Sequence, residues 1–422
     1  MTRYIDLRSG LLLTLALALA LLAAPALAQT EDKDTMTAPP WGDAGARITF
    51  GDEDQGTLQV QYKAQFRANY RDFGSGTEGD DTTTNLGFRR NRLAFMGAWS
   101  DKVSLYVQGE FALPNLAPVD FSGAGFENDF QLLDAAVRFS FSDAFKVTVG
   151  RFKYNLSREN LEACEDPLTL DRSLFIRTSY VGTRDDGIAV WGNLFNDRFQ
   201  YRVDAMEGRQ AAAGITAPAS NPRFSARGHV TLLEPEASYG YKGTYLGTKK
   251  VLTVGGAYQF EKKVTYTDVD TQLGNNDYQA WTVDGFFEYP FAGAGTVTAS
   301  AAYEKVDLDG AYTGANPDGG ATGLFGEKNG WYAKAGYLFS GVPLQVFGRY
   351  EKWRFACLNN VFDQIVDWYG FGANYYIWGQ NLKLTAEFSK TDFDVEGTYT
   401  SLQSSRTSKD FNQFVAQIQF IF

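Results

Sequence analysis

Apolar and polar side chains alternate with a period of two along most of the chain from residue 57 onward. The last stretch, FNQFVAQIQFIF (411–422), places Phe420 and Phe422 on one parity and Gln417 and Gln419 on the other. A period of two is typical of β-strands whose two faces meet different surroundings. The alternation predicts sixteen strands, at 57–68, 87–98, 102–112, 131–141, 145–153, 186–194, 198–207, 222–233, 250–260, 278–288, 294–304, 330–339, 342–354, 365–377, 380–389 and 411–422.

The connections between these predicted strands alternate between short and long. Short breaks include WSD (99–101) and FND (195–197), and the long connections are 69–86, 113–130, 154–185, 208–221, 261–277, 305–329, 355–364 and 390–410. Outer-membrane barrels have short periplasmic turns and long external loops. The connection at 234–249 is longer than a periplasmic turn should be.

This pattern predicts an all-β fold, a 16-stranded antiparallel transmembrane β-barrel with long external loops. An even strand number places both termini on the periplasmic side. The last strand must pair with the first, because lipid cannot satisfy the backbone groups of an open edge. Composition agrees, since aromatic residues make up 15% of the chain and prolines number 12. The outward faces are expected to contact outer-membrane lipid and lipopolysaccharide.

The N-terminus has the features of a secretory signal peptide. Arg3 and Arg8 precede the apolar run LLLTLALALALLAA (11–24), and an Ala-Leu-Ala site follows at 26–28. A basic region, a short apolar stretch and a small-residue site predict cleavage after Ala28, so that residues 1–28 are removed. Residues 29–56 are predicted to form a periplasmic lead-in with a short strand at 47–50, and residues 57–422 to form the barrel.

Charge and the scarcity of reactive side chains exclude several functions. The formal net charge is −11, which argues against nucleic acid as a partner. His229 is the single histidine and has no neighbouring ligands in the sequence, so we expect no enzyme activity, no metal site and no cofactor. Cys164 and Cys357 fall in the third and seventh long connections, where they could form a disulfide or remain free thiols.

Assigning the apolar parity outward predicts the charge of the lumen. The inward bases on the first eight strands are Lys63, Arg67, Arg90, Arg92, Arg138, Lys146, Arg202, Arg223 and Arg227, and the inward acids are Glu110, Asp134 and Asp204. On the last eight strands the inward acids are Asp284, Glu288, Glu304, Glu351, Asp367 and Glu387, and the bases are Lys334, Arg349 and Lys383. A basic arc facing an acidic arc would draw anions along one wall. Alternatively, the charges cancel in salt, since the Debye length is about 8 Å at physiological ionic strength.

The stretch VGRFKYNLSRENLEACEDPLTLDRSLFIR (149–177) resembles the constriction-loop region of the phosphate-selective porin O/P family. The features that carry the resemblance are Gly150, Phe152, Lys153, Leu161–Glu162 and Asp171–Arg172–Ser173. The stretches before it, FRRNRLAFMG (88–97) and LLDAAVRFSFSDAFKVTVG (132–150), resemble the preceding strands of that family. One departure is Tyr154–Asn155, which stands where the family commonly has Pro-Phe.

The resemblance implies a homotrimeric channel whose third external loop, about 154–185, folds inward to narrow the pore. It also implies phosphate or a related oxyanion as the solute. The terminal Phe422 resembles the C-terminal signature by which outer-membrane barrels are recognised by the barrel-assembly machinery. Acidic residues outnumber basic ones in this loop. Arg172 and Arg177 are therefore interpreted as pairing with carboxylates of the loop and the wall, which would hold the loop in place.

These observations predict an outer-membrane porin for passive diffusion of small hydrophilic solutes, with a preference for anions. Guanidinium groups bind phosphate and carboxylate in a bidentate manner, which suits arginine to an anion path. The predicted anion-binding and pore-lining residues are Arg90, Arg92, Arg138, Lys63, Arg67, Arg202, Arg227, Lys153, Arg158 and Arg172. A general non-selective porin, and a structural barrel that sheaths a redox or transport partner, remain as alternatives.

Overall fold

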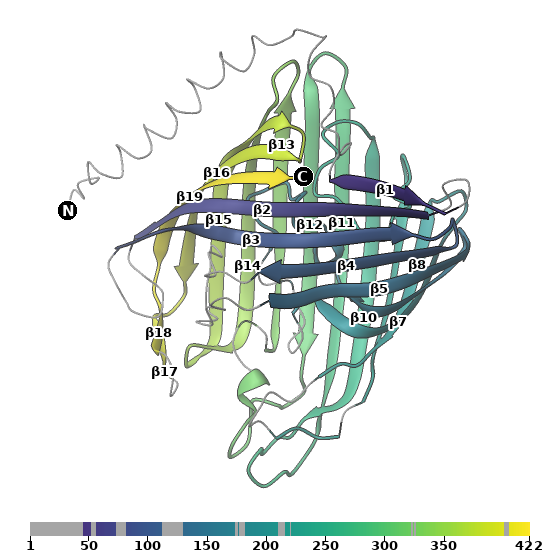
Figure 1. The fold of residues 1–422 in the computed structure, drawn as a ribbon. Coiled ribbons are helices and arrows are strands. Elements are labelled where there is room, and N and C mark those ends of the chain that lie inside the picture. The colour runs from purple at the N-terminus through teal and green to yellow at the C-terminus, as the bar shows by residue number, and fades with distance from the viewer. Residues whose placement is uncertain are drawn as a thin grey trace, which may run out of the picture.

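The computed structural model describes residues 45–51, 56–72, 82–111, 130–173, 176, 182–209, 216–219, 221–321, 324, 326–400 and 405–422. Its main feature is a closed barrel of antiparallel strands (Figure 1). The described helices are the single turns α2 (Arg158–Leu161) and η2 (Gly319–Ala321), and neither is long and apolar enough to cross a membrane. The predicted signal peptide and most of the predicted lead-in lie outside the described residues.

Each of the sixteen predicted strands corresponds to one strand of the barrel. These are β2 (Gly56–Asp72), β3 (Thr82–Ala98), β4 (Val103–Phe111), β5 (Phe130–Ser142), β6 (Phe145–Lys153), β7 (Arg184–Leu194), β8 (Phe199–Met206), β9 (Arg223–Thr231), β10 (Val251–Thr265), β11 (Asn276–Phe291), β12 (Gly295–Asp307), β13 (Lys328–Phe339), β14 (Leu344–Leu358), β15 (Val361–Trp378), β16 (Leu382–Phe393) and β19 (Phe411–Ile421). Several strands run further than predicted at the end with the long connections, because backbone pairing continues there beyond the alternating segment.

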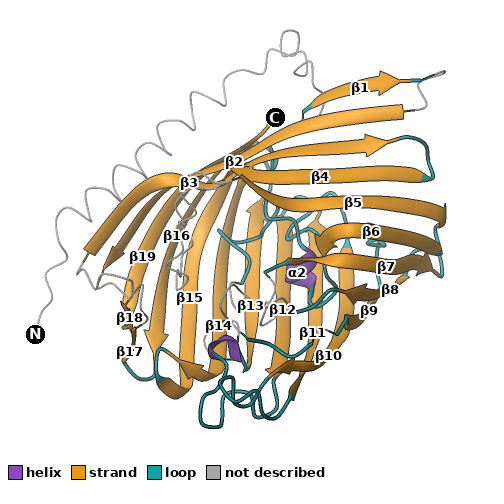
Figure 2. Cartoon of the chain, turned by 60° about the horizontal axis from the view of Figure 1, so that its bottom comes forward, coloured by secondary structure: helices purple, strands orange, loops and turns teal. Residues whose placement is uncertain are grey.

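The barrel closes through pairing of the last strand with the first, and β1 (Ala46–Phe50) completes the seam (Figure 2). At the C-terminus, the backbone N–H of Tyr62 donates to the carbonyl of Phe422 at 2.7 Å, and the N–H of Phe422 donates back at 2.9 Å. Beyond this point β1 pairs with the start of β2, with Ala46 opposite Val60. The short strand predicted at 47–50 therefore continues the row of β19, so that little of this edge of β2 is left open to lipid.

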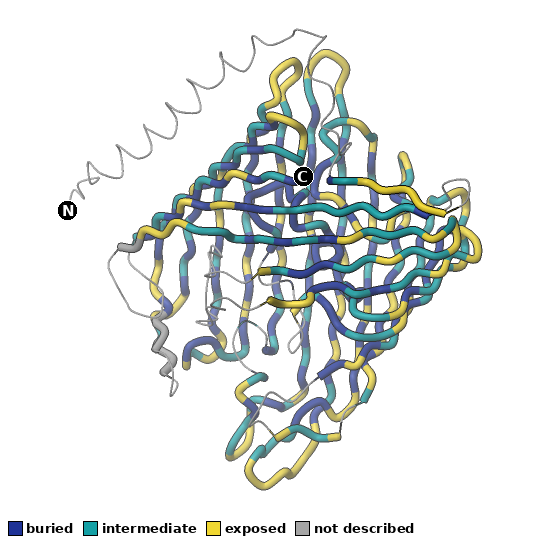
Figure 3. The backbone as a smooth tube through the Cα atoms, viewed as in Figure 1, coloured by how far each residue is buried: buried dark blue, intermediate teal, exposed yellow. Residues whose placement is uncertain are grey.

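Burial is inverted relative to a water-soluble protein, as expected for a barrel in lipid. Exposed apolar side chains such as Phe139, Val203 and Phe371 face outward, whereas polar side chains such as Gln65 and Arg67 are buried inside. Figure 3 shows the resulting alternation of buried and less buried residues along the strands. The two-faced pattern in the sequence thus separates a lipid-facing surface from a polar interior.

Aromatic side chains gather on the outer surface at the end with the short turns. Neighbouring ring centroids lie 5.4 Å apart in Phe141–Phe145, 4.9 Å in Tyr289–Phe291, 5.1 Å in Tyr337–Phe339 and 5.7 Å in Phe420–Phe422. Aromatic girdles of this kind mark the membrane interfaces of outer-membrane barrels, and short turns mark the periplasmic side. We therefore refer to this end as the periplasmic end.

Three details of the predicted wall are wrong. The connection predicted at 355–364 is a two-residue turn, since β14 ends at Leu358 and β15 begins at Val361. Cys357 accordingly lies in β14, opposite Phe362, and not in an external loop. Asp367 points outward, where it accepts a hydrogen bond from Tyr350 and lies 3.6 Å from Lys352. The apolar parity misassigned it, because β15 carries Val366 and Trp368 on the inner face.

The last long connection contains an additional element. Strands β17 (Gly397–Thr400) and β18 (Ser405–Ser408) form a two-stranded antiparallel sheet separate from the barrel. The remaining connections at the external end begin and end close to the predicted positions.

Removal of Phe422 should impair barrel assembly. The deletion removes the two backbone hydrogen bonds to Tyr62 and one ring of the aromatic girdle. Each lost backbone hydrogen bond costs more in lipid than in water, because nothing replaces it there. We expect less heat-resistant folded protein in outer-membrane fractions on semi-native gels. Phe422→Tyr is the control, because it keeps both backbone hydrogen bonds and an aromatic ring at this position. This variant should assemble normally.

Candidate functional site

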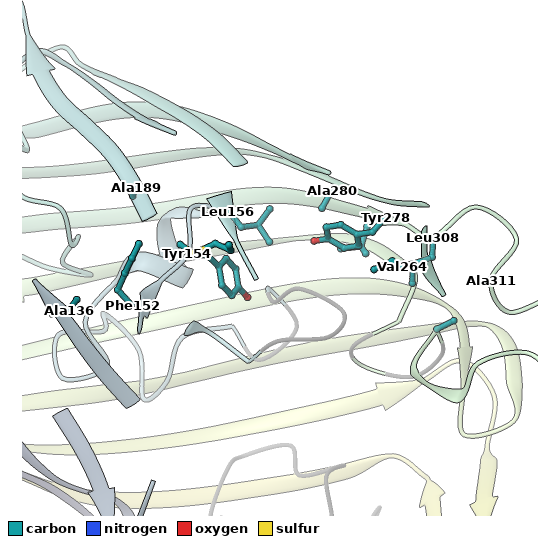
Figure 4. Packing of buried hydrophobic residues seen from close by; sticks show 13 residues of the cluster. Ala136, Phe152, Tyr154, Leu156, Ala189, Val264, Tyr278, Ala280, Leu308 and Ala311 are labelled. Atoms are coloured by element: carbon teal, nitrogen blue, oxygen red, sulfur yellow. The ribbon is translucent and has the colours of Figure 1, made fainter. Parts of the chain in front are cut away.

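The third connection, residues 154–183 between β6 and β7, is called loop three here, and its described residues 154–173 enter the barrel. Its first residues, Tyr154 and Leu156, are fully buried in an apolar cluster with Tyr278 of the wall and Leu308 of the connection after β12 (Figure 4). Ser157 then caps helix α2, because its side chain accepts a hydrogen bond from the backbone N–H of Asn160 at 3.0 Å. The apolar anchor and the cap fix where the loop turns inward.

Asp171 attaches loop three to the basic wall. Its carboxylate lies 2.7 Å from Arg67 on β2 and 3.0 Å from Arg90 on β3. Arg89 lies 3.8 Å away as well, since a β-bulge between the pairs Arg90–Gln65 and Phe88–Phe66 leaves it as the extra residue. Burial alone would raise the pKa of Asp171, but the three arginines outweigh it and hold this pKa well below its usual range.

The same loop also contacts the opposite, acidic wall. Glu159 pairs with Lys334 on β13, and the hydroxyl of Ser173 donates to Glu351 on β14 at 2.5 Å. Two loop amides donate to wall carboxylates, from Arg158 to Asp284 at 3.2 Å and from Leu170 to Glu387 at 3.2 Å. Loop three therefore spans the lumen between the two predicted arcs.

A second segment reaches the lumen from the periplasmic end. Residues 232–250, which we call the long turn, connect β9 and β10 and correspond to the unusually long connection noted at 234–249. Glu236 accepts two hydrogen bonds from the guanidinium of Arg158, at 2.7 and 2.8 Å. The backbone N–H of Ala163 donates to Tyr241 at 3.1 Å. Loop three is thus held from both ends of the barrel.

Close backbone approach between these two segments requires a glycine at position 243. The N–H of Gly243 donates to the carbonyl of Asp166 at 3.0 Å. A Cβ atom at Gly243 would lie 2.6 Å from the backbone nitrogen of Leu168, which is too close for any real contact. At Gly240 the nearest atom would be 3.5 Å away, an ordinary contact. The fit is therefore tight at one point of the long turn and loose three residues earlier.

A cavity of about 240 Å³ lies between loop three, the long turn and the wall formed by β2 to β7. Its charged lining residues are Lys63, Arg92, Arg138, Lys153, Arg184, Asp134 and Glu165. Because a water molecule occupies about 30 Å³ in the liquid, this space holds several waters or one small organic anion. Five cationic side chains and two carboxylates therefore line the same cavity.

The structure brings four of the ten predicted site residues to this cavity, namely Lys63, Arg92, Arg138 and Lys153. Two of them have carboxylate partners. Lys63 lies 3.8 Å from Glu165, and Arg92 lies 3.0 Å from Glu110. Lys153 donates to the backbone carbonyl of Glu162. Among the described residues, neither Arg138 nor Lys153 has a carboxylate within 4 Å.

The other six predicted residues have structural partners or lie away from the cavity. Arg67 and Arg90 bind Asp171, as above, and Arg227 forms a bidentate pair with Asp284 at 2.6 and 2.8 Å. Arg158 is committed to Glu236. Arg202 lies 4.7 Å from each of the Tyr239 and Tyr241 ring centroids, and Arg172 donates to the carbonyl of Glu159 at 2.8 Å.

Arg172 holds the loop in a different way from that predicted. Its guanidinium also reaches the carbonyls of Asn160 and Glu162, each at 3.2 Å, and so caps the end of helix α2. It thus bonds backbone carbonyls where pairing with loop carboxylates had been expected. Arg177, the second residue in that interpretation, lies outside the described residues.

Several contributing residues were not among the predicted site residues. Arg184 lines the cavity and pairs with Asp134 at 3.0 Å, and its position at the end of the loop was a usable signal. Arg89 sits on the apolar parity of β3 and turns inward because of the bulge. Tyr239 and Glu236 belong to the long turn, whose unusual length was the one indication in the sequence.

The two cysteines are free thiols in the structure, so the alternative of a disulfide is not realised. Cys164 is buried in loop three, where its carbonyl accepts a hydrogen bond from Gln65 at 3.2 Å. Burial by itself would raise the pKa of this thiol, but Arg172, Arg90 and Arg92 hold it well below its usual range. Cys357 lies at the external end of β14, opposite Phe362.

The pKa values of two further loop acids, Glu162 and Glu165, are shifted in opposite directions by their surroundings. Burial and then the neighbouring carboxylate of Glu159 raise the pKa of Glu162 to about 8. Burial would also raise the pKa of Glu165, but Lys63 and Arg92 outweigh it and keep this pKa well below its usual range. Glu165 is therefore a fixed negative charge in the cavity, whereas Glu162 changes charge near neutral pH.

Residues 60–422 match the family described as phosphate-selective porin O and P. The chain belongs to this family. The match covers the barrel from the start of β2 to the C-terminus, and it identifies the protein as a porin of the outer membrane. No curated protein matches this chain with significant similarity.

Solved porin structures share the fold at low sequence identity. The anion-selective porin from Comamonas acidovorans has 12% identity and a TM-score of 0.52, covering 87% of this chain and 100% of that one. The outer membrane channel DcaP of Acinetobacter baumannii has 16% identity, a TM-score of 0.51 and coverages of 88% and 100%. OmpF of Salmonella typhi, in complex with daunomycin, has 14% identity, a TM-score of 0.55 and coverages of 89% and 100%. This likeness supports the sixteen-stranded porin barrel.

Replacement of Asp171 with asparagine should loosen loop three. Breaking a buried ion pair costs about 3–5 kcal/mol, and here Arg67 and Arg90 would also lose their countercharge. We expect a higher single-channel conductance and a stronger anion preference. Asp166→Asn is the matched control, because Asp166 lies 3.9 Å from a half-exposed lysine, Lys242. Equal conductance in the two variants and the wild type would contradict the role assigned to Asp171.

Anion preference should fall as the pH rises through the range in which Glu162 titrates. With a pKa of about 8, the side chain is neutral below this pH and negative above it. Its neighbours Leu161 and Ala163 line the cavity, so the added charge repels anions there. We expect the reversal potential in a salt gradient to shift toward cations between about pH 6 and 9. Glu162→Gln should reduce this shift, and an unchanged shift in that variant would assign it to another group.

Proposed function

We propose that this porin forms a water-filled channel for passive diffusion of small hydrophilic solutes, with a preference for anions. The observation that carries the proposal is the lining of the cavity, where cationic side chains outnumber carboxylates by five to two. A channel conducts selectively when its lining supplies weak, repeated contacts to one sign of charge. The wall from β2 to β7 supplies such contacts for anions.

Two of the five cations have no carboxylate within 4 Å among the described residues. Arg184, Lys63 and Arg92 are balanced by Asp134, Glu165 and Glu110, respectively. Arg138 and Lys153 are not balanced in this way. Charges that line an enclosed space are less screened by salt than charges on an open surface. The excess of cations over carboxylates in the lining therefore supports anion preference over the alternative of a non-selective pore.

A strict phosphate site is not what this lining favours. The carboxylates of Asp134 and Glu165 face the same cavity and would repel a dianion. Five of the predicted arginines are committed to carboxylates, namely Arg67, Arg90, Arg92, Arg158 and Arg227. We therefore propose a weak preference for anions in general, with phosphate or a related oxyanion among the solutes.

The interior is also unsuited to a sheath around a redox or transport partner. The described part of loop three crosses the lumen and contacts both walls, which leaves no open bore for a second protein. The homotrimer implied by the family resemblance stays a prediction. Cross-linking of protein in native outer membranes, followed by denaturing electrophoresis, would test it.

Reversal potentials of purified channels in planar bilayers with a KCl gradient test the proposed function. We expect a potential whose sign reports chloride preference. Arg92→Gln should reduce that preference, because it removes a cavity cation, whereas Arg354→Gln should leave it unchanged, because Arg354 lies on the exposed outer face near Asp363. A wild-type channel that prefers potassium would refute the proposal.

A further inference from the structure

Arg138 occupies an unusual position in the cavity wall. Its guanidinium lies 4.9 Å from the ring centroid of Trp191 and 5.6 Å from that of Tyr239. Its Nε atom is buried without a hydrogen-bond partner among the described residues. Aromatic faces stabilise a cation without neutralising it. The side chain is thus positioned by rings, and its two terminal nitrogens, which have no hydrogen-bond partner among the described residues, remain for a ligand.

The wall next to Arg138 is apolar and aromatic. Phe152 and Ala136 line the cavity together with Tyr239, and Leu161 of helix α2 faces the same space. The Phe152 and Tyr239 rings meet edge to face with centroids 6.3 Å apart, and Tyr239 meets Trp191 in the same manner at 5.2 Å. Contact with such a surface contributes no binding free energy to a fully hydrated inorganic anion. A flat apolar group binds there favourably, because its apolar surface is removed from water.

The charges of the cavity also limit the ligand. Of the two lining cations without a carboxylate partner, Lys153 donates to the backbone carbonyl of Glu162, which leaves the guanidinium of Arg138 to bind one carboxylate group in a bidentate manner. Asp134 and Glu165 line the same space and disfavour a second negative charge. The volume of about 240 Å³ accommodates a single aromatic ring with a carboxylate.

From this combination we propose that the cavity is a binding site for small aryl monocarboxylates, with Arg138 holding the carboxylate and Tyr239 and Phe152 contacting the ring. The inference rests on the proposed anion-preferring channel and specifies the class of solute that it favours. Tyr239 reaches the site because the long turn folds into the lumen, where its hydroxyl donates to the carbonyl of Lys153 at 3.3 Å. The long turn would therefore serve selectivity as well as support of loop three.

The test measures block of chloride current by added anions in planar bilayers at neutral pH. Benzoate carries the proposed ring, acetate has the carboxylate alone, and inorganic phosphate has neither feature. Because aromatic contacts contribute about 0.5–1.5 kcal/mol beyond area burial, we expect benzoate to reach half-block at about five-fold lower concentration than acetate. Half-block by phosphate at the lowest concentration, or equal values for benzoate and acetate, would overturn the inference.

Two variants separate the ring from the charge. Tyr239→Leu should raise the half-blocking concentration of benzoate and leave that of acetate nearly unchanged. Arg138→Gln should raise both. Tyr337→Leu is the matched control, because this tyrosine lies in the outer aromatic girdle against Phe339. If Tyr239→Leu and Tyr337→Leu behave alike, the ring contact is refuted.

The reversal potential, measured on the same channels, distinguishes the two levels of the argument. An anion-preferring channel that treats benzoate and acetate alike overturns the aryl-carboxylate site alone. A cation-preferring channel overturns the proposed function and the site together.

Discussion

The interior of this barrel depends on a carboxylate buried among arginines. Asp171 lies within 3.0 Å of Arg67 and Arg90, and all three side chains are almost fully buried. Each of these charges would destabilise the folded protein without the others, because a buried ion loses its hydration and needs an opposite charge to offset that loss. The arginines belong to the rigid wall, whereas the carboxylate belongs to loop three. The pairing therefore requires the loop to lie inside the barrel, and the shape of the channel follows from it.

The lumen contains side chains that hold loop three in place and other side chains that line the cavity. Glu159 and Ser173 attach the loop to β13 and β14, and Glu236 of the long turn neutralises Arg158. On the acidic side, Asp284 pairs with Arg227 and Glu351 pairs with Arg349. On the side of β2 to β7, Arg138 and Lys153 line the cavity and have no carboxylate within 4 Å among the described residues. In the proposed function, anion preference would come from such lining cations, and not from the total charge of the chain, which is −11.

The alternation of side chains was sufficient to predict the barrel, because lipid on one face and polar groups on the other constrain every strand. It failed at Asp367, where β15 turns Val366 and Trp368 toward the interior. It could not place Arg89 either, because a bulge changes the register by one residue. Which inward arginines would face solutes was also beyond the sequence. That outcome depends on contacts between segments far apart in the chain, such as Asp171 with Arg67 and Tyr239 with Arg138.

Hydrogen exchange of the native protein, followed by mass spectrometry, tests most directly whether loop three is a fixed part of the interior. The account predicts that peptides covering residues 157–173 are protected as strongly as the barrel strands, because their amides donate to Ser157, Asp284, Glu159 and Glu387. Peptides from the external connection at 270–275, whose residues are all exposed, should exchange much faster. Fast exchange throughout residues 157–173 would show a mobile loop and contradict the central role given to Asp171.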